Sequence, residues 1–203
     1  MNRGMYIALE GIEGAGKSTV AGALVELITA GGHRVIVVRE PGGTPTGEKI
    51  RRILLEPENS VAPWTEALLF SAARAQLAAD VVEPQLQAGT WVVSDRSVYS
   101  SLAYQGAGRE LGIAEVRAVN APGLGPTWPD LVALLRIEVG EGLSRQEVPD
   151  RIGAAGHDFL SKVAEGFAGL AVAEPDRFVV VDATRPVVDV AGVIWKVAQD
   201  RHG

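Results

Sequence analysis

A glycine-rich stretch near the start of the chain carries the residue types of a phosphate-binding site. Residues 7–22 read IALEGIEGAGKSTVAG, and Gly11–Ser18 fits the pattern G-x-x-x-x-G-K-[ST]. Glycines allow backbone angles and a close approach that a Cβ would prevent, so main-chain N–H groups can form a nest for anions. We therefore predict a site for ATP or GTP; a glycine-rich turn with a solvated lysine is the alternative.

The residues predicted to hold the nucleotide are those of this loop and of the helix start that follows it. Lys17 is expected to reach the β- and γ-phosphates, and the Ser18 hydroxyl to ligate Mg²⁺. The unpaired N–H groups at the helix start add the positive end of the helix dipole. The complete predicted set is Gly11, Ile12, Glu13, Gly14, Ala15, Gly16, Lys17, Ser18 and Thr19.

Further charged residues follow other apolar runs, where ligands of open parallel sheets bind. In SDRSVYS, Arg96 suits a bidentate grip on a phosphate and Asp95 suits Mg²⁺, although a surface ion pair at a helix start is the alternative. Arg39, in REPGGT, has the same placement. Glu13 either accepts a hydrogen bond from a substrate hydroxyl near the γ-phosphate or points into solvent.

An aromatic ring and a guanidinium share one face of a predicted helix. The stretch EALLFSAARAQL places Phe70 and Arg74 four residues apart. Together they could stack on a flat heterocycle and hydrogen-bond its edge. Taken alone, such a ring is more often a core residue and such an arginine more often solvated.

The scaffold for these residues is predicted from alternating apolar runs and helical patterns. Strands are expected at residues 5–10, 34–38, 90–94, 131–137 and 178–181. Helices are expected at residues 17–30, 44–55, 64–88, 98–104 (interrupted by the glycines of QGAGRELG), 115–120, 159–173 and 187–200. This alternation favours a three-layer α/β fold, with a five-stranded parallel sheet flanked by helices, in a single domain spanning residues 1–203.

Composition excludes several classes of function. The 203 residues are 47% hydrophobic, enough for one core, and the net charge of −6 argues against a broad nucleic-acid-binding face. The absence of cysteine excludes disulfides and thiolate metal sites and fits the reducing cytoplasm. The sequence predicts neither a signal peptide nor a membrane span.

The motifs together resemble those of one enzyme family. The segments EGIEGAGKST, REPGGT, FSAARAQ, DRSVYSSLAYQGAG and PDLVALL occur in the order and spacing seen in bacterial thymidylate kinases, over about residues 5–195. The resemblance implies a P-loop fold, a homodimer, and transfer of the γ-phosphoryl group of ATP to dTMP with Mg²⁺, in dTTP biosynthesis.

The resemblance also implies roles for individual residues. Arg96, helped by Arg39, would hold the acceptor phosphate, and Glu13 would meet the 3′-hydroxyl region of the sugar. Tyr104 would crowd the 2′ position and favour deoxyribose. The predicted base-binding residues are Phe70, which would stack on thymine, Arg74, which would hydrogen-bond its carbonyl edge, and Ser101 and Gln105, which would lie nearby.

The chain departs from the family pattern mainly in the predicted lid, at about residues 141–156. Arg136 stands where relatives carry an aspartate, and the shortened lid keeps only Arg145 and Arg151. We predict that Arg145 or Arg151 offsets charge on the transferring phosphoryl group, and solvated surface charge is the alternative for both. Ser97 replaces an aromatic residue that often follows the Asp-Arg pair.

These departures leave other functions open. One is a kinase for a deoxynucleoside or a modified pyrimidine monophosphate. Another is a catalytically weakened, nucleotide-binding regulatory protein on the same scaffold.

Overall fold

Five parallel strands form the centre of the computed structural model, which describes residues 3–145 and 151–202. The strands are β1 (Tyr6–Glu10), β2 (Val35–Arg39), β3 (Trp91–Asp95), β4 (Leu131–Arg136) and β5 (Phe178–Asp182). Their order is β2-β3-β1-β4-β5, so the strand that leads into the glycine-rich loop is the central one. In register, Leu9 of β1 pairs with Asp95 on one side and with Ala133 on the other. The predicted five-stranded parallel sheet is confirmed.

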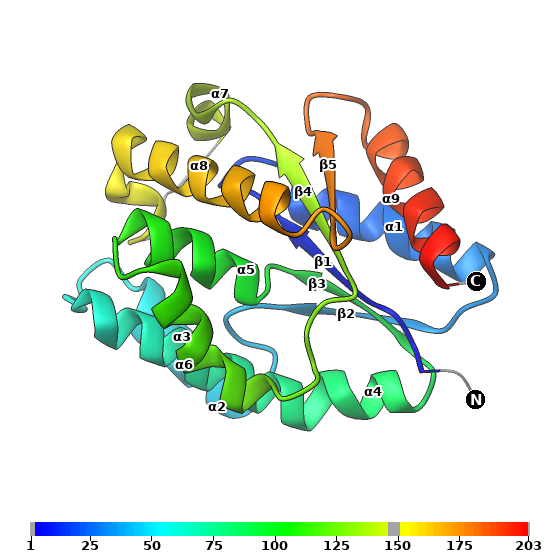
Figure 1. Cartoon of the computed structure of the whole chain (residues 1–203), viewed down its shortest axis with the longest axis horizontal. Coiled ribbons are helices and arrows are strands. Elements are labelled where there is room, and N and C mark those ends of the chain that lie inside the picture. The colour runs from blue at the N-terminus through cyan, green and yellow to red at the C-terminus, as the bar shows by residue number, and fades with distance from the viewer. Residues whose placement is uncertain (1–2, 146–150, 203) are drawn as a thin grey trace.

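Helices cover both faces of this sheet (Figure 1). Those of the described residues are α1 (Lys17–Ala30), α2 (Pro45–Leu55), α3 (Pro63–Leu77), α4 (Glu83–Gln87), α5 (Val98–Ser101), α6 (Ile113–Leu124), α7 (Val139–Ser144), α8 (His157–Ala173) and α9 (Val187–His202). Two π-helical segments, η1 (Ala78–Val82) and η2 (Leu102–Gly108), and a 3₁₀ turn, η3 (Gly153–Ala155), complete the set. Helices α1 and α9 pack together on one face, and α3, α4 and α6 lie on the other (Figure 1).

The alternation of side chains along β1 divides the core between the two faces. Ile7 and Leu9 pack in the cluster that contains Leu24 of α1, while Tyr6 packs in a separate cluster with Leu86 of α4. All five residues of β1 are buried. By the same alternation, Glu10 points to the face opposite α1, where α5 begins.

Two helical predictions were wrong in detail. The predicted helix at residues 64–88 is a helical run in which the π-helical turn η1 separates α3 from α4. The glycines after Gln105 do not stop the helix at Tyr104, because η2 continues to Gly108. A Cβ on Gly108 would lie 2.8 Å from the ring of Phe159. The glycine therefore allows η2 to pack closely on α8.

The predicted lid is described only in part. Helix α7, which was not predicted, ends at Ser144, and the chain is described again from Arg151. Residues 146–150 lie outside the described residues. Within residues 3–145 and 151–202, we find no helix with the length and apolar character that a membrane crossing needs.

Candidate active site

The glycine-rich loop connects the carboxyl end of β1 to the start of α1, as predicted. Gly14 and Gly16 adopt left-handed backbone angles, with φ of 76° and 79°. A Cβ on Gly14 would lie 2.1 Å from the carbonyl oxygen of Gly142 in α7, so only glycine fits this approach. Gly16 caps α1 without a side-chain hydrogen bond, which leaves the first N–H groups of the helix open to an anion. The side chains of Ile12 and Ala15 are buried, so these residues offer a ligand only their backbone.

Lys17 lies along the inside of this loop. Its Nζ donates hydrogen bonds to the carbonyl oxygens of Gly11, at 3.1 Å, and Ile12, at 2.9 Å. Burial, with the nearby charge of Arg96, lowers the pKa of the Lys17 amine to about 8, against the opposing effect of Asp95. The ammonium is thus desolvated and close to where the outer phosphates of a nucleotide would bind.

Ser18 and Asp95 bring two oxygen ligands together beside the loop. The Ser18 hydroxyl, at the start of α1, donates a 2.6 Å hydrogen bond to Oδ2 of Asp95, at the end of β3. Mg²⁺ prefers oxygen ligands and usually keeps waters and substrate phosphates in its shell. Two protein oxygen ligands are compatible with such a shell. Among the described residues, no group of three or more His, Cys, Asp or Glu side chains is placed to hold a metal.

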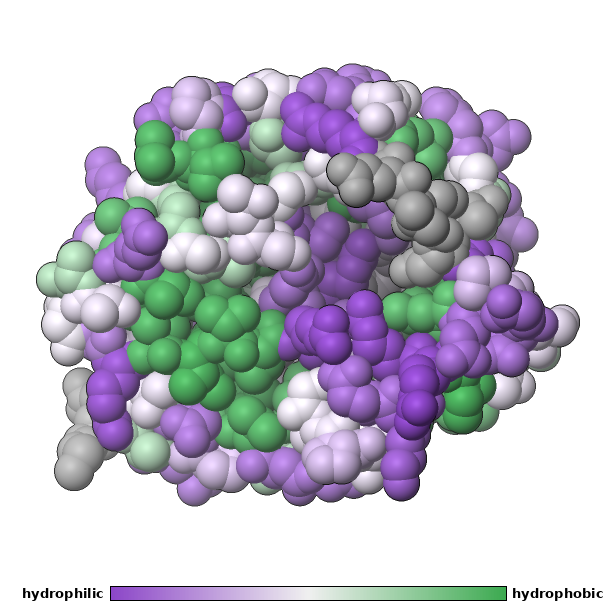
Figure 2. Space-filling model, turned by 180° about the vertical axis from the view of Figure 1, so that it is seen from behind, coloured by the Kyte–Doolittle hydropathy of each residue, from purple (hydrophilic) through white to green (hydrophobic). Residues whose placement is uncertain are grey.

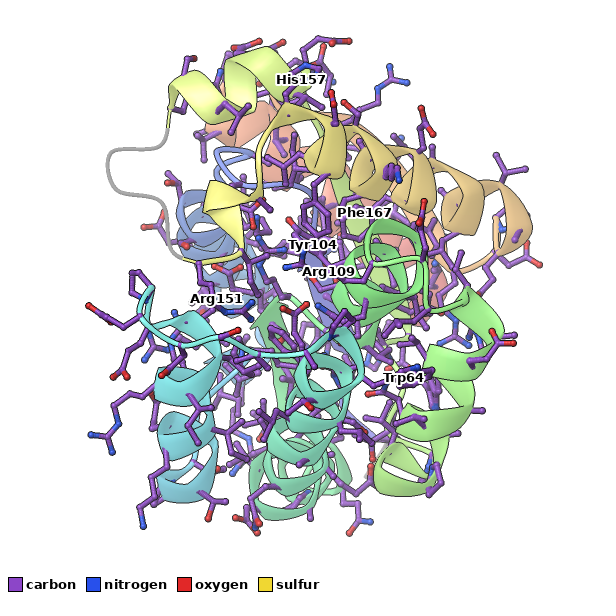
Figure 3. All side chains as sticks on the ribbon, turned by 90° about the vertical axis from the view of Figure 1, so that its left-hand side faces the viewer. Trp64, Tyr104, Arg109, Arg151, His157 and Phe167 are labelled. Carbon is purple, nitrogen blue, oxygen red and sulfur yellow. The ribbon has the colours of Figure 1, made fainter. Side chains whose placement is uncertain are left out.

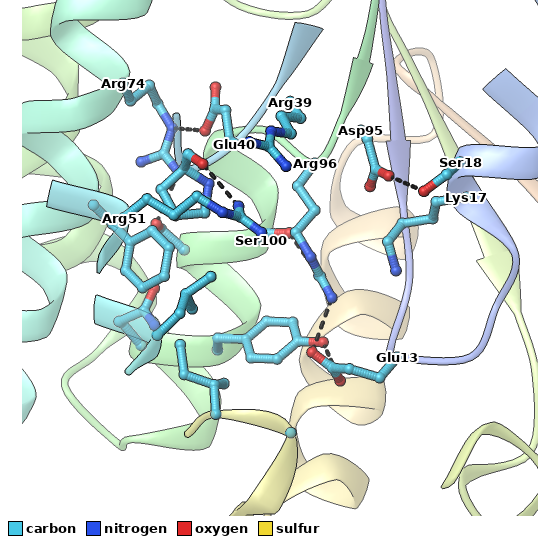
Figure 4. A pocket seen from close by; sticks show the side chains of 18 of the residues that line it. Glu13, Lys17, Ser18, Arg39, Glu40, Arg51, Arg74, Asp95, Arg96 and Ser100 are labelled. Carbon is cyan, nitrogen blue, oxygen red and sulfur yellow. Dashed lines mark hydrogen bonds and ion pairs between the residues drawn. The ribbon is translucent and has the colours of Figure 1, made fainter. Parts of the chain in front are cut away.

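Arg96 lies between the glycine-rich loop and α5, and it contacts both. Its Nη1 donates to the carbonyl oxygen of Gly11, at 3.2 Å, and to Oγ of Ser100, at 3.1 Å. Its Nη2 donates to Oε1 of Glu13 at 2.9 Å, and its guanidinium lies 5.0 Å from the ring centre of Tyr104 (Figure 4). Glu13 therefore points into the site and not into solvent.

Glu13 also accepts a 2.8 Å hydrogen bond from the Tyr104 hydroxyl, through Oε2. Burial raises the pKa of the Glu13 carboxyl, but the charges of Arg96 and Lys17 outweigh it and hold that pKa below its ordinary value. The carboxylate is therefore ionised at neutral pH.

Arg74 is buried and fixed on several sides. Its Nε donates to Oε2 of Glu40 at 2.6 Å, and its Nη1 donates to Oδ1 of Asn120 at 2.5 Å. Its Nη2 donates to the carbonyl oxygen of Ser97, at 3.2 Å, and to Oγ of Ser101, at 3.0 Å. These bonds occupy four of the five N–H groups of a guanidinium, which leaves one for a ligand.

These groups line one cleft of about 410 Å³ at the carboxyl ends of the strands. Hydrophilic side chains line a hollow in the right-hand half of the space-filling view (Figure 2). Twelve of the predicted site residues line the cleft: Glu13, Gly14, Lys17, Ser18, Arg39, Phe70, Arg74, Asp95, Arg96, Ser101, Tyr104 and Gln105. The structure thus gathers residues from the loop after β1 and from α1, β2, α3, the end of β3, α5 and η2 at one site.

Three predicted arginines differ in how close they come to this cleft. Arg39 lines it but is 57% exposed and paired with Glu48 at 3.2 Å. Arg145 is exposed and lies outside the lining, although its Nη1 is 3.4 Å from the carbonyl oxygen of Gly14. Arg151, labelled in Figure 3, also lies outside the lining. Its Nη2 pairs with Glu66 at 2.6 Å.

Other lining residues were not predicted from the sequence. Glu40 lies one residue beyond Arg39, so the strand-end reasoning that selected Arg39 could have found it. Arg51 lines the cleft from α2 and donates a 2.8 Å hydrogen bond to the carbonyl oxygen of Pro41, a contact with no sequence signal. Ser100, Ile152 and Gly153 also line the cleft.

The chain is similar to known proteins over nearly its whole length. A family model described as thymidylate kinase matches residues 9–194. The chain is 45% identical to a thymidylate kinase from Deinococcus radiodurans, over 99% of each chain. It is 45% identical to one from Desulforudis audaxviator, over 95% of this chain and 89% of the relative. It is 38% identical to one from Caldanaerobacter subterraneus subsp. tengcongensis, over 98% and 96%. This chain belongs to the thymidylate kinase family.

Membership of the thymidylate kinase family explains why the sequence motifs meet in space. The match to the family extends across Arg136 and the predicted lid, so both lie within the part of the chain that is similar to thymidylate kinases. The geometry adds that the glycine-rich loop follows β1, and that Asp95 and Arg96 lie at the end of β3, the strand that pairs with β1.

Proposed function

We propose that this cleft transfers the γ-phosphoryl group of ATP to dTMP, giving dTDP and ADP, which is the activity of the thymidylate kinase family. One observation carries the proposal: Arg96 is hydrogen-bonded to the carbonyl oxygen of Gly11, so a guanidinium suited to an acceptor phosphate borders the donor loop. Phosphoryl transfer depends chiefly on placing two phosphates in line and neutralising their charge.

The donor half of the cleft would hold ATP through the loop. Main-chain N–H groups of residues 11–19 would bind the phosphates, and Lys17 would exchange its two carbonyl acceptors for phosphate oxygens. Ser18 and Asp95 would hold Mg²⁺, which when bound neutralises charge on the phosphate oxygens. Their existing 2.6 Å contact supports this assignment.

The acceptor half would hold dTMP between β3 and α3. Arg96, assisted by Arg39, would bind its phosphate, Phe70 would stack on the base, and the free N–H of Arg74 would meet a base carbonyl. Ser101 and Gln105 would border the base, and Tyr104, held by Glu13, would crowd the 2′ position. A phosphate oxygen of dTMP would then attack the γ-phosphorus as ADP leaves.

The decisive experiment measures ADP release with several acceptors under identical conditions. The panel is dTMP, dUMP, dCMP, GMP and thymidine, each with ATP and Mg²⁺ in a coupled assay. We expect dTMP to be the best acceptor and dTDP to be the product by chromatography. Activity confined to thymidine would show a deoxynucleoside kinase, and ATP binding without turnover would show a regulatory protein.

The lid arginines allow a separate prediction. We propose that Arg145 or Arg151 offsets charge on the transferring phosphoryl group. Arg145→Ala should lower kcat at least tenfold, because Arg145 already lies at the phosphate loop. Arg151 could reach the phosphoryl group only after its ion pair with Glu66 breaks. Arg151→Ala therefore tests the same role for an arginine that lies farther from the phosphate loop. Unchanged kcat in both variants, measured at saturating substrates, would exclude the role for both residues.

We also propose that the protein is a homodimer. Helices α2 and α3 pack side by side and expose large apolar side chains, namely Ile53 at 47%, Trp64 at 42% and Leu68 at 53%. Exposed apolar groups on adjacent elements favour association.

A further inference from the structure

Glu10 is a fully buried carboxylate directly before the phosphate loop. It is the last residue of β1, and its exposed fraction is 0%. A buried charge is costly unless hydrogen bonds or an ion pair compensate it. Burial raises the pKa of this carboxyl, while hydrogen bonds from Ser100 and Ser97 act against that rise.

Among the described residues, the donors to the Glu10 carboxyl group come from the segment that follows β3. Oε1 of Glu10 accepts from Oγ of Ser97, at 2.7 Å, and from the backbone N–H of Ser100, at 3.0 Å. Oε2 accepts from Oγ of Ser100 at 2.6 Å. The carboxylate is therefore bound three times by two serines that follow Arg96 closely in the sequence.

Arg96 needs such support because its backbone is strained. Its φ of 72° lies in the left-handed region, which residues with a Cβ adopt only when their surroundings hold them there. The N–H of Arg96 donates to the carbonyl oxygen of Leu9 at 3.0 Å, and Oγ of Ser94 donates to the Arg96 carbonyl oxygen at 2.5 Å. Farther along the side chain, Nη1 donates to Oγ of Ser100, the same hydroxyl that donates to Glu10.

We infer that Glu10 is a positioning residue, which fixes Arg96 relative to the phosphate loop through Ser97 and Ser100. The inference rests on the proposed function, in which Arg96 holds the acceptor phosphate. Glu10 is bonded covalently to Gly11, the first residue of the phosphate loop. Its carboxyl group therefore connects that loop to the serines that contact or follow Arg96. Small errors in the distance between two reacting phosphates lower the rate steeply.

Ser97 contributes to this arrangement through more than one atom. The Ser97 hydroxyl also accepts from the N–H of Tyr99 at 3.2 Å, and its carbonyl oxygen accepts from Arg74. Ser97 therefore contacts both Glu10, which lies beside the proposed phosphate-binding Arg96, and Arg74, which is proposed to bind the base.

The test compares three variants with a matched control. Ser97→Ala removes one hydrogen bond to Glu10, Ser100→Ala removes the hydroxyl shared with Arg96, and Glu10→Gln replaces one accepting carboxyl oxygen with an amide nitrogen that cannot accept. The control is Thr127→Val, which removes a buried hydroxyl that donates at 2.9 Å to a carboxylate, Glu83, outside the cleft lining.

We expect kcat/KM for dTMP to fall about 3- to 10-fold in Ser97→Ala and more in Ser100→Ala and Glu10→Gln. KM for ATP should stay within about twofold of wild type, and Thr127→Val should leave both parameters unchanged. A purely structural role would instead lower the melting temperature without a specific loss in dTMP use. Unchanged kcat/KM for dTMP in Ser97→Ala and Ser100→Ala would overturn the inference.

A double-variant cycle then asks whether the effect passes through Arg96. In an Arg96→Lys background, adding Ser97→Ala should change kcat/KM for dTMP by less than about twofold, because the geometry it protects is already lost. An equal loss in both backgrounds would show that Glu10 and its serines act independently of Arg96. If wild-type enzyme prefers another monophosphate, the proposed acceptor fails, and the same cycle on that monophosphate still decides the role of Glu10.

Discussion

At the scale of the residue, burial lowers the pKa of Lys17 in the site where a phosphate is proposed to bind. Its two acceptors are loop carbonyl oxygens, which are weaker partners for an ammonium than phosphate oxygens. Removing the amine from water costs free energy before the ligand arrives, and that cost appears as a pKa lowered to about 8. A bound polyphosphate reverses the shift, so binding of ATP and protonation of Lys17 are coupled.

This coupling predicts a pH dependence of ATP affinity. Below pH 8 the free enzyme carries charged Lys17 and the Kd for ATP should be constant. Above pH 8 the amine is neutral before binding, so Kd should rise by up to tenfold per pH unit. Calorimetry between pH 6.5 and 9.5 measures this directly. Lys17→Met should bind ATP weakly with a flat profile over the same range, and a wild-type profile that is equally flat would contradict the prediction.

At the scale of the element, Glu66 connects the segment after the lid to two helical elements. It is buried in α3 and accepts from Gln105 of η2 at 2.9 Å, from Arg109 at 3.2 Å and from Arg151 at 2.6 Å. Arg151 also donates to the carbonyl oxygen of Leu54 in α2 at 2.7 Å. The neighbouring Ile152 and Gly153, which line the cleft, are thereby held against α2 and α3.

Replacing Glu66 should therefore destabilise the fold in a pH-dependent way. Burial raises the pKa of this carboxyl, but hydrogen bonds from Arg109, Gln105 and Arg151 outweigh it and hold the pKa below its ordinary value. The stabilisation is present above the unfolded-state pKa and is lost as pH falls through the folded-state value. Glu66→Gln should cost about 2 kcal/mol at pH 7, which corresponds to a melting temperature about 4–8 °C lower.

The matched control for this prediction is Glu110→Gln. Glu110 forms an exposed ion pair with Lys162 at 2.6 Å, and its replacement should leave the melting temperature unchanged. The difference between Glu66→Gln and wild type should also shrink at pH 4. Equal melting temperatures for wild type and Glu66→Gln at pH 7 would show that the buried carboxylate does not stabilise the fold.

The secondary-structure elements also show how much of the fold could be predicted from the sequence. Short apolar runs bounded by turn residues placed every strand to within a residue or so, and the loop motif placed α1 at Lys17–Ala30. Arg109 and Arg151 meet Glu66 from 43 and 85 residues away, so no local pattern indicates that contact. Helix α7 was missed because VGEGLS contains two glycines and lacks helical periodicity. The gathering of strand-end residues at one site was predictable, whereas individual side-chain contacts such as those of Glu66 were not.

At the scale of the whole molecule, α3 serves two surfaces. Its buried face carries Arg74, while Trp64 and Leu68, four residues apart, form an exposed apolar stripe on another face. A symmetric dimer through this stripe would bury the same side chains from both copies. The acceptor site would then depend on association, because the helix that carries Phe70 and Arg74 would also form the interface.

This arrangement predicts that one charge on α3 separates the dimer. Wild-type protein should sediment at twice the chain mass of 21.3 kDa. Leu68→Glu would place two carboxylates in an apolar interface, and the dimer Kd should rise at least tenfold. Val188→Glu, at a 70% exposed position on α9, adds the same charge elsewhere and should leave the dimer intact.

Sedimentation at several concentrations compares the three proteins, and an undisturbed Leu68→Glu dimer would place the interface on another face. Because α3 carries the base-binding residues, the KM for dTMP should rise in Leu68→Glu and not in Val188→Glu.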